Sequence, residues 1–156
     1  MAKINILFIC LGNICRSPMA EYYMKDLVEK EGLGWAFRIE SAATSREEQG
    51  NDVYPPARRE LQRHGIPCPG RAARQITKAD YEDFDYLICM ESANIRNALR
   101  IWGSDPHGKI SRLLDHTARR GDVADPWYTG DFEATWRDVS EGCSALLHEL
   151  RQRHAL

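Results

Sequence analysis

Residues 6–23 read ILFICLGNICRSPMAEYY. The stretch begins as an unbroken apolar run, which is typical of a strand buried on both faces of a sheet. The run stops at a Gly-Asn pair, which favours a tight turn, and a Ser-Pro pair that is typical of a helix start follows. We therefore predict a strand over residues 4–10, a tight loop, and a helix with Ser17 as its N-cap and Pro18 at its first position.

Three further short apolar segments, at residues 37–42, 84–90 and 110–114, have the same character. Helical patterns lie between the strands, and the last and clearest begins after Asp131, a candidate N-cap. Its apolar positions are Phe132, Trp136, Val139, Cys143, Leu146, Leu147 and Leu150. Strands alternating with helices predict an α/β fold, an open four-stranded parallel sheet with helices on both faces. Ligands bind such sheets at the carboxyl ends of the strands, so the loop after the first strand is the candidate site.

Length and composition set the broad class of the protein. The 156 residues, 43% of them hydrophobic, fit one domain over residues 1–156. Lys and Arg number 21 against 23 Asp and Glu, with no run of five like charges, so nucleic acid is not an expected partner. No apolar stretch approaches the roughly 20 residues that span a bilayer. The five cysteines are an odd number at irregular spacing, which favours reduced thiols over a disulfide framework. No signal-peptide cleavage site follows the first apolar run, so we expect a cytoplasmic protein.

The loop carries a C-x5-R-S pattern made of Cys10, Arg16 and Ser17, with Gly12 and Asn13 between them. Backbone N–H groups of a tight loop that enters a helix form a concave anion site, which suits a phosphate. Gly12 permits an unusual φ, and Asn13 tolerates the left-handed region, so several amides can converge on one point.

Cys10 is expected at the base of this anion site, where the amides and Arg16 favour thiolate over thiol. Arg16 supplies a planar fork for two phosphate oxygens, and Ser17 can donate its hydroxyl to the thiolate. A lone cysteine at a strand end more often has a packing role, but this combination of residues favours a catalytic loop. Cys15 is either a packed thiol or the partner of Cys10 in a reversible, protective disulfide.

A thiolate that displaces an alkoxide or phenolate from phosphorus needs an acid opposite it. Two Asp-Pro pairs offer one, at Asp105 and Asp125. We select Asp125, because proline stiffens its backbone and the following Trp127 and Tyr128 can form walls against a flat aryl group. A turn whose aromatic residues complete the core is the alternative.

The sequence gives no reason to expect a metal or another cofactor, because the five histidines show no ligand spacing with one another or with the cysteines. The charged cluster Arg46, Glu47 and Glu48 reads as a solvated loop.

With CLGNICRSPMAE at residues 10–21 and DPWY at 125–128, the chain resembles the low-molecular-weight protein tyrosine phosphatases, and DPWYTGDFE is similar to the bacterial members. The resemblance implies a four-stranded parallel sheet and a metal-free, two-step reaction. Cys10 would attack phosphorus to give a cysteinyl-phosphate while Asp125 protonates the leaving phenol, and water activated by Asp125 would then release phosphate. Arg16 would bind the phosphate.

The expected substrate contacts are Leu11, Gly12, Asn13, Ile14, Cys15, Ser17, Trp127 and Tyr128. By the resemblance, Ser41 steadies the Asn13 side chain. The chain departs from the family pattern at Ala43, at Arg71 in place of a histidine, at Glu47 in place of a pocket-wall aromatic, and at residues 54–57. These departures concern the rim of the pocket, where a glutamate repels an incoming phosphate, although salt screens an exposed charge over about 10 Å.

The resulting prediction is a phosphotyrosine protein phosphatase that acts as a monomer or weak dimer, with an autophosphorylating bacterial tyrosine kinase that controls exopolysaccharide export as a partner. Phosphoarginine hydrolysis is an alternative, although relatives with that activity carry Thr at the position of Ile14. Arsenate reduction is another, but it uses a close cysteine pair, and Cys68 and Cys89 are far apart in sequence. A phosphopeptide-binding module without turnover is the non-enzymatic alternative.

Overall fold

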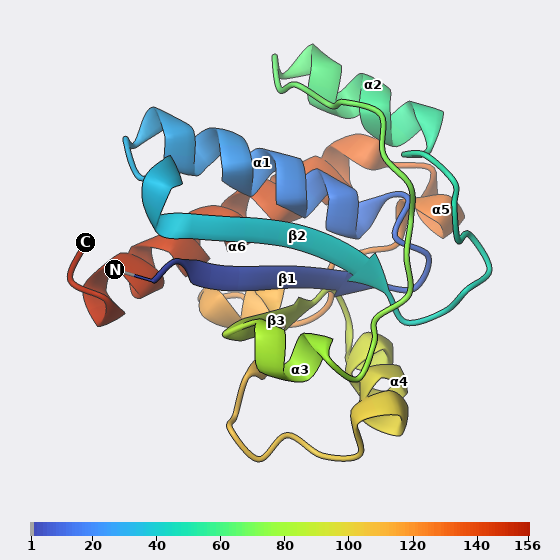
Figure 1. Cartoon of the computed structure of the whole chain (residues 1–156). Helices are drawn as coiled ribbons and strands as arrows, with labels where there is room; N and C mark the ends of the chain where they lie inside the picture. Colours follow the sequence, from blue (N-terminus) through green and yellow to red (C-terminus); the bar gives the residue numbers. More distant parts are fainter. Residues whose placement is uncertain (1) are drawn as a thin grey trace.

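Four parallel strands form one sheet in the order β2-β1-β3-β4, in a computed structural model that describes residues 2–156 (Figure 1). The strands are β1 (Ile4–Cys10), β2 (Phe37–Ala43), β3 (Tyr86–Cys89) and β4 (Ile110–Arg112). The α-helices are α1 (Arg16–Lys30), α2 (Pro55–Arg63), α3 (Asp80–Asp83), α4 (Ser92–Trp102), α5 (Pro126–Thr129) and α6 (Phe132–Arg153), with short 3-10 helices η1 (Gly34–Ala36) and η2 (Leu113–His116). The predicted α/β class and parallel sheet are confirmed.

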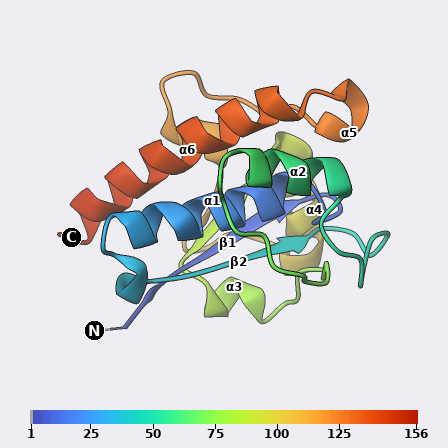
Figure 2. The same cartoon turned by 90° about the horizontal axis from the view of Figure 1, so that it is seen from above.

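Helices cover both faces of the sheet. Helices α1 and α6 lie on one face with α2 beside them, and α3 and α4 lie on the other (Figures 1 and 2). Alternate residues of β1 enter the two cores: Ile6 and Phe8 pack toward α1 and α6, whereas Leu7 and Ile9 pack toward α3 and α4. Burial on both faces explains why this strand reads as an unbroken apolar run.

β2, the second strand in sequence, pairs with one edge of β1, and β3, the third, pairs with the other edge. The strand order therefore reverses between β1 and β3, at the point where open α/β sheets leave a crevice beyond their carboxyl ends. The loop that follows Cys10 and the loop that follows Cys89 both open into this crevice.

The predicted bounds of β1 are reproduced, and the other strands differ by a few residues. β2 extends one residue further, to Ala43. β3 begins at Tyr86 rather than at Phe84, because Phe84 is the C-cap of α3, and it ends at Cys89, one residue before the predicted Met90. β4 ends at Arg112, because Leu113 starts a 3-10 turn.

The start of α1 was predicted wrongly. The helix begins at Arg16, after Cys15, and Ser17 is its second residue and caps no backbone amide. The hydroxyl of Ser17 faces Cys10 instead, with Oγ and Sγ 2.9 Å apart. The predicted cap of α6 is correct, since the Asp131 carboxylate accepts the Ala134 amide at 2.9 Å. Within residues 2–156 no helix is both long and apolar enough to cross a membrane.

Candidate active site

The loop between β1 and α1 directs its carbonyl oxygens outward. They accept hydrogen bonds from the amides of Thr44 (to Cys10, 2.9 Å), Ser45 (to Leu11, 3.2 Å) and Tyr54 (to Ile14, 2.9 Å) and from Arg71 Nη1 (to Asn13, 2.7 Å). The C=O and N–H groups of a trans peptide point in opposite directions, so the amides that follow these carbonyls point into the hollow. Together with the start of α1, they form the anion site that the sequence predicts.

Asn13 makes the sharp turn of the loop. Its φ of 60° lies in the left-handed region, as predicted, and its amide donates to Cys10 Sγ at 3.2 Å. The expectation of an unusual φ at Gly12 was wrong, because Gly12 is not among the residues with positive φ. Its lack of a side chain matters for space: a Cβ there would lie 3.2 Å from Cγ of Glu48.

A chain of hydrogen bonds beneath the loop fixes the direction of the Ser17 hydroxyl. The side-chain nitrogen of Asn13, Nδ2, donates both to Ser17 Oγ (2.8 Å) and to Ser41 Oγ (2.9 Å). The Ser41 hydroxyl donates in turn to Glu21. Because Ser17 Oγ already accepts from Asn13, its own proton is free for the sulfur of Cys10. This bond stabilises a thiolate. The placement of Ser41 beside Asn13 agrees with the expectation from sequence.

Arg71 lies beneath the same loop rather than at the pocket rim. Its guanidinium donates to the backbone oxygen of Asn13 (2.7 Å), to Asn13 Oδ1 (2.6 Å) and to Ser41 Oγ (3.0 Å). The side-chain oxygen of Asn13 also accepts the amide of Arg74 at 3.3 Å. The expectation that Arg71 reshapes the rim is therefore wrong, and its contacts are with the residues that shape the loop.

Arg16 is 2% exposed and is held on three sides. Its Nη1 pairs with Glu91 and donates to the Val123 carbonyl at 3.0 Å, while Nη2 lies 3.4 Å from Asp125 Oδ2. Burial lowers the pKa of Arg16, but the charge of Cys10 and the hydrogen bond to Glu91 outweigh burial and raise it above its ordinary value. Arg16 is therefore a fixed cation beside the thiol.

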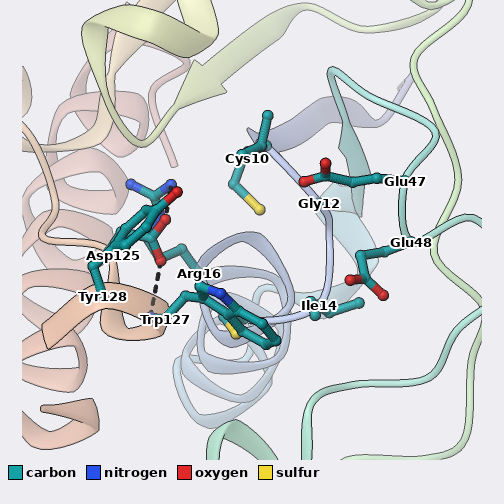
Figure 3. Close-up of a pocket in the computed structure, with 11 residues that line it drawn as sticks. Cys10, Gly12, Ile14, Arg16, Glu47, Glu48, Asp125, Trp127 and Tyr128 are labelled. Atoms are coloured by element: carbon teal, nitrogen blue, oxygen red, sulfur yellow. Dashed lines mark hydrogen bonds and ion pairs between the residues drawn. The ribbon is translucent and has the colours of Figure 1, made fainter. Parts of the chain in front are cut away.

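Asp125 lies across the pocket from Cys10 (Figure 3). Its Oδ1 accepts the Trp127 amide at 3.0 Å, which makes it the N-cap of α5 and fixes the carboxylate. The rejected candidate, Asp105, lies elsewhere: it accepts the amides of Lys109 (2.8 Å) and Ile110 (3.1 Å) and the hydroxyl of Tyr81. The choice of Asp125 over Asp105 agrees with this geometry.

The pocket above Cys10 has a volume of about 310 Å³. The loop and the start of α1 contribute Cys10, Leu11, Gly12, Ile14, Cys15 and Arg16 to its lining. Trp127 and Tyr128, which are 54% and 80% exposed, form part of the opposite side with Asp125. Asn13, in the loop, and Ser17, in α1, are fully buried and do not line the pocket, in contrast to their expected substrate contacts. They support the loop and the sulfur instead.

Glu47 and Glu48 also line the pocket, on the side away from Trp127 (Figure 3). The interpretation of this charged cluster as a merely solvated loop was therefore wrong for both glutamates, although Arg46 is exposed and bonds Gln75. The resemblance did place Glu47 at the pocket wall, but Glu48 was missed. A short cluster of charged residues after a strand resembles an ordinary polar loop, and only the fold brings Glu48 over Gly12.

The sequence reasoning also missed Glu91 and Glu21. Glu91 lies two residues after the end of β3, beside the reversal of strand order, and a carboxylate at that place is the signal that could have identified a partner for Arg16. Glu21 is one turn into α1 and ends the hydrogen-bond chain that starts at Ser17. Its partner Ser41 comes from β2, so their pairing depends on the tertiary fold.

The five cysteines are all free thiols. Burial, followed by the charge of Cys10, raises the pKa of Cys15 to about 12. Burial also raises the pKa values of Cys68, Cys89 and Cys143. Cys68 packs against the α1 and α6 core and Cys89 lies in the α3 and α4 core, so the sheet separates them. Among residues 2–156 no group of three or more His, Cys, Asp or Glu has a geometry that could hold a metal ion.

The site therefore combines a thiol, a fixed cation, a ring of amides and a carboxylate around one pocket. This set can hold a tetrahedral oxyanion, attack its central atom in line and protonate the group that leaves.

Comparison with known proteins identifies the family of the chain. The sequence model of the low molecular weight phosphotyrosine protein phosphatases matches residues 5–156. The chain is 39% identical over 155 residues to the low molecular weight protein-tyrosine-phosphatase YfkJ of Bacillus subtilis. The alignment covers 98% of this chain and 99% of YfkJ. It is also 39% identical over 150 residues to the human low molecular weight phosphotyrosine protein phosphatase, covering 93% and 94% of the two chains.

Solved structures agree with the sequence comparison. The crystal structure of YfkJ superimposes with a TM-score of 0.95 over 98% of each chain. A Drosophila arginine phosphatase superimposes with a TM-score of 0.83 at 27% identity, over 94% of this chain and 97% of its own. The family match extends over nearly the whole chain, and the C-x5-R-S loop and Asp125 lie within it. The chain belongs to the low molecular weight phosphotyrosine protein phosphatase family.

Proposed function

We propose that this protein hydrolyses phosphotyrosine, in proteins and in simpler aryl phosphates, through a cysteinyl-phosphate on Cys10. The observation that carries the proposal is the environment of the Cys10 sulfur. It accepts the Asn13 amide, lies 2.9 Å from the Ser17 hydroxyl and faces the pocket that Arg16 and Asp125 also line. A thiolate so placed can attack phosphorus.

In the first step the Cys10 thiolate forms a bond to phosphorus while the bond from phosphorus to the phenolic oxygen breaks. Asp125 gives its proton to that oxygen, so that a neutral phenol leaves. Arg16 and the loop amides hold the three remaining oxygens, whose charge distribution changes as phosphorus becomes trigonal bipyramidal. In the second step Asp125 takes a proton from water, the water oxygen attacks phosphorus, and the Cys10 thiolate leaves with help from Ser17.

Trp127 and Tyr128 supply an apolar side to the pocket that suits a phenyl ring. This favours an aryl phosphate over a phosphate on a short aliphatic side chain. Ile14, which lines the pocket from the loop, is branched and apolar and offers no hydrogen bond to a guanidinium. These two features favour phosphotyrosine over phosphoarginine, although a Drosophila arginine phosphatase has the same fold.

Arsenate reduction receives no support from the cysteines. Cys68 and Cys89 lie on opposite sides of the sheet and cannot pair without unfolding.

Within a bacterial cell we further propose a cytoplasmic location, action as a monomer or weak dimer, and an autophosphorylating tyrosine kinase of exopolysaccharide export as a partner. The free cysteines suit a reducing compartment, and the bacterial character of the segment after Asp125 supports the choice of partner. The test uses the phosphotyrosine segment of such a kinase. The wild-type protein should remove its phosphate, and the Cys10→Ser variant should bind the phosphorylated segment without hydrolysing it.

The activity is tested by phosphate release, in EDTA, from a phosphotyrosine peptide and from a phosphoarginine peptide of matched sequence. We expect a clear phosphotyrosine preference, no turnover by Cys10→Ser, and a phosphoryl group on Cys10 after rapid quenching and mass mapping. A preference for phosphoarginine would overturn the substrate assignment. Equal turnover by wild type and Cys10→Ser would overturn the covalent mechanism, and binding of the peptide without turnover would identify a binding module.

A further inference from the structure

The pocket above Cys10 has two unlike sides. Trp127 and Tyr128, on α5, are apolar and largely exposed. The opposite side is formed by Glu47 and Glu48, from the loop that follows β2 (Figure 3). The acidic rim, as we call these two glutamates, lines the same pocket as Cys10 and so borders the space that a bound phosphotyrosine would occupy.

The two carboxylates of the acidic rim are not neutralised by cations of the protein. Within residues 2–156 no Lys, Arg or His lies within ion-pair distance of either one. The adjacent Arg46 donates to Gln75 at 3.0 Å. Glu48 accepts the side-chain amide of Asn51 at 2.7 Å and packs over Gly12, so its position is fixed, while Glu47 is exposed.

The only cation that lines the pocket among the described residues is Arg16. It is buried at the bottom and pairs with Glu91 and Asp125, so it serves the phosphate rather than the rim. A second open hollow beyond α5 offers no compensation. It is lined by two arginines, Arg59 and Arg63, but also by three carboxylates, those of Glu60, Asp131 and Glu133. The mouth of the site is therefore acidic on the side of residues 47–48.

Charge complementarity determines which sequences fit this mouth. A phosphotyrosine flanked by Asp or Glu would place like charges together, whereas a flanking Lys or Arg would meet the free carboxylates of Glu47 and Glu48. Consecutive Cα atoms are 3.8 Å apart, so residues one or two positions from the phosphotyrosine are within side-chain reach of the rim. We propose that the acidic rim selects phosphotyrosine that lies in a basic sequence context.

This inference rests on the proposed phosphotyrosine hydrolysis and adds a substrate class to it. An exposed ion pair contributes about 0.2–1 kcal/mol, so two such pairs correspond to a roughly 2- to 30-fold preference in kcat/KM for a basic over a neutral peptide. An acidic peptide is expected to be hydrolysed more slowly than the neutral one. Because both carboxylates are near the surface, salt weakens the preference.

The test compares three phosphotyrosine peptides that differ only in the two residues on each side, which are Lys, Gln or Glu. The variant Glu47→Gln/Glu48→Gln keeps the side-chain lengths and the hydrogen bond to Asn51 but removes both charges. The matched control is Glu82→Gln/Asp83→Asn, which removes two exposed carboxylates of α3 that do not line the pocket. The single variant Glu47→Gln covers the case in which the double variant folds poorly.

For the wild type and the control we expect kcat/KM to fall in the order Lys, Gln, Glu peptide, and the differences to shrink between 0.02 and 0.5 M NaCl. In the double variant the three values are expected to converge, with the Glu47→Gln variant in between. Equal values in the wild type, or an unchanged order in both rim variants, would overturn the selection by charge. No hydrolysis of any peptide by the wild type would instead overturn the proposed function, so the two failures are distinguishable.

Discussion

Glu91 pairs with the buried guanidinium of Arg16, and its backbone amide donates to Asn94 Oδ1 at the start of α4, at 3.0 Å. The bond to Asn94 therefore fixes the backbone of Glu91, and the Glu91 carboxylate fixes the cation that faces the phosphate. Through this pair the end of β3 is linked to the loop after β1 across the reversal of strand order.

The Glu91→Gln variant is expected to lower kcat/KM by about 10- to 100-fold, because Gln matches the size of Glu but removes the negative charge beside Arg16 Nη1. Removal of one member of a fully buried pair costs about 3–5 kcal/mol. Glu91 is partly exposed, and Arg16 keeps its contacts with Val123 and Asp125. We therefore expect the variant to lose only about 1–2 kcal/mol of unfolding free energy, measured with urea. The surface variant Glu141→Gln is the control and should leave both measurements unchanged. An unaltered kcat/KM in Glu91→Gln would show that Arg16 needs no such partner.

Asp125→Asn should affect hydrolysis in proportion to the need for a proton. With aryl phosphates whose phenols are poor leaving groups, we expect kcat to fall by roughly 10²–10⁴-fold, the range of general acid catalysis. A strongly electron-withdrawing phenol leaves without a proton and should show a much smaller loss. The measurement is kcat across a series of substituted phenyl phosphates. A loss of the same size for every phenol would assign Asp125 a positioning role only.

Asp105→Asn should behave in the opposite way, with nearly normal kcat and a less stable fold. Burial raises the pKa of Asp105, but the hydrogen bonds from Tyr81 and from the amides of Lys109 and Ile110 outweigh it and hold the pKa below its usual 3.8. A depressed pKa stabilises the fold above pH 3.8, and this contribution is lost as the pH falls below that value. The difference in unfolding midpoint between wild type and variant should therefore be full at pH 7 and shrink at pH 3. If the difference in unfolding midpoint were the same at pH 7 and pH 3, the charge of the Asp105 carboxylate would not be its cause.

The fold and the floor of the site were predictable because they depend on local sequence. The apolar run of β1 and the Gly-Asn turn are contiguous, so periodicity and turn chemistry identify the loop around Cys10. The same local reasoning failed at Ser17. Its sequence neighbours are those of an N-cap, but the structure uses its hydroxyl for the sulfur, and that contact forms only when β1 and α1 meet.

Partners from distant segments could not be predicted from patterns of residues. Glu91, 75 positions from Arg16, and Arg71, 58 positions from Asn13, are both polar residues next to turns, and many such residues are simply solvated. Nothing in their local sequence distinguishes them. The tertiary fold decides which of them face the loop, and the acidic rim at residues 47–48 belongs to the same class of contact.

Arg71→Ala should lower kcat by about tenfold, because three hydrogen bonds to Asn13 and Ser41 support the left-handed turn of the loop. Arg71→His is expected to restore part of the activity, and more of it at low pH. An imidazole titrates near pH 6.5, and its protonated form donates from both nitrogens and carries the missing charge. The measurement is the pH profile of kcat, with Arg153→His at the far end of the chain as control. A profile of Arg71→His without a new inflection near pH 6–7 would contradict this role of the cation.

Cys15 should resist alkylation at neutral pH. A thiol with a pKa of about 12 is thiolate in roughly one molecule in 10⁵ at pH 7, and the thiolate is the reactive form. Limiting iodoacetamide should therefore label Cys10 and spare Cys15, as read by mass mapping.

In the Cys10→Ser variant Cys15 loses a neighbouring charge but remains buried, and burial is the main cause of its raised pKa. Its labelling should stay slow at pH 7, accelerate about tenfold per pH unit while the protein is folded, and become fast in urea. Fast labelling at pH 7 in the folded variant would contradict the effect of burial.

The raised pKa of Cys15 also bears on the reversible disulfide with Cys10. Once peroxide has oxidised Cys10 to a sulfenic acid, the Cys15 sulfur must attack the Cys10 sulfur and displace water from it. Because that attack needs the rare thiolate of Cys15, disulfide formation should be slow at pH 7 and faster at pH 9.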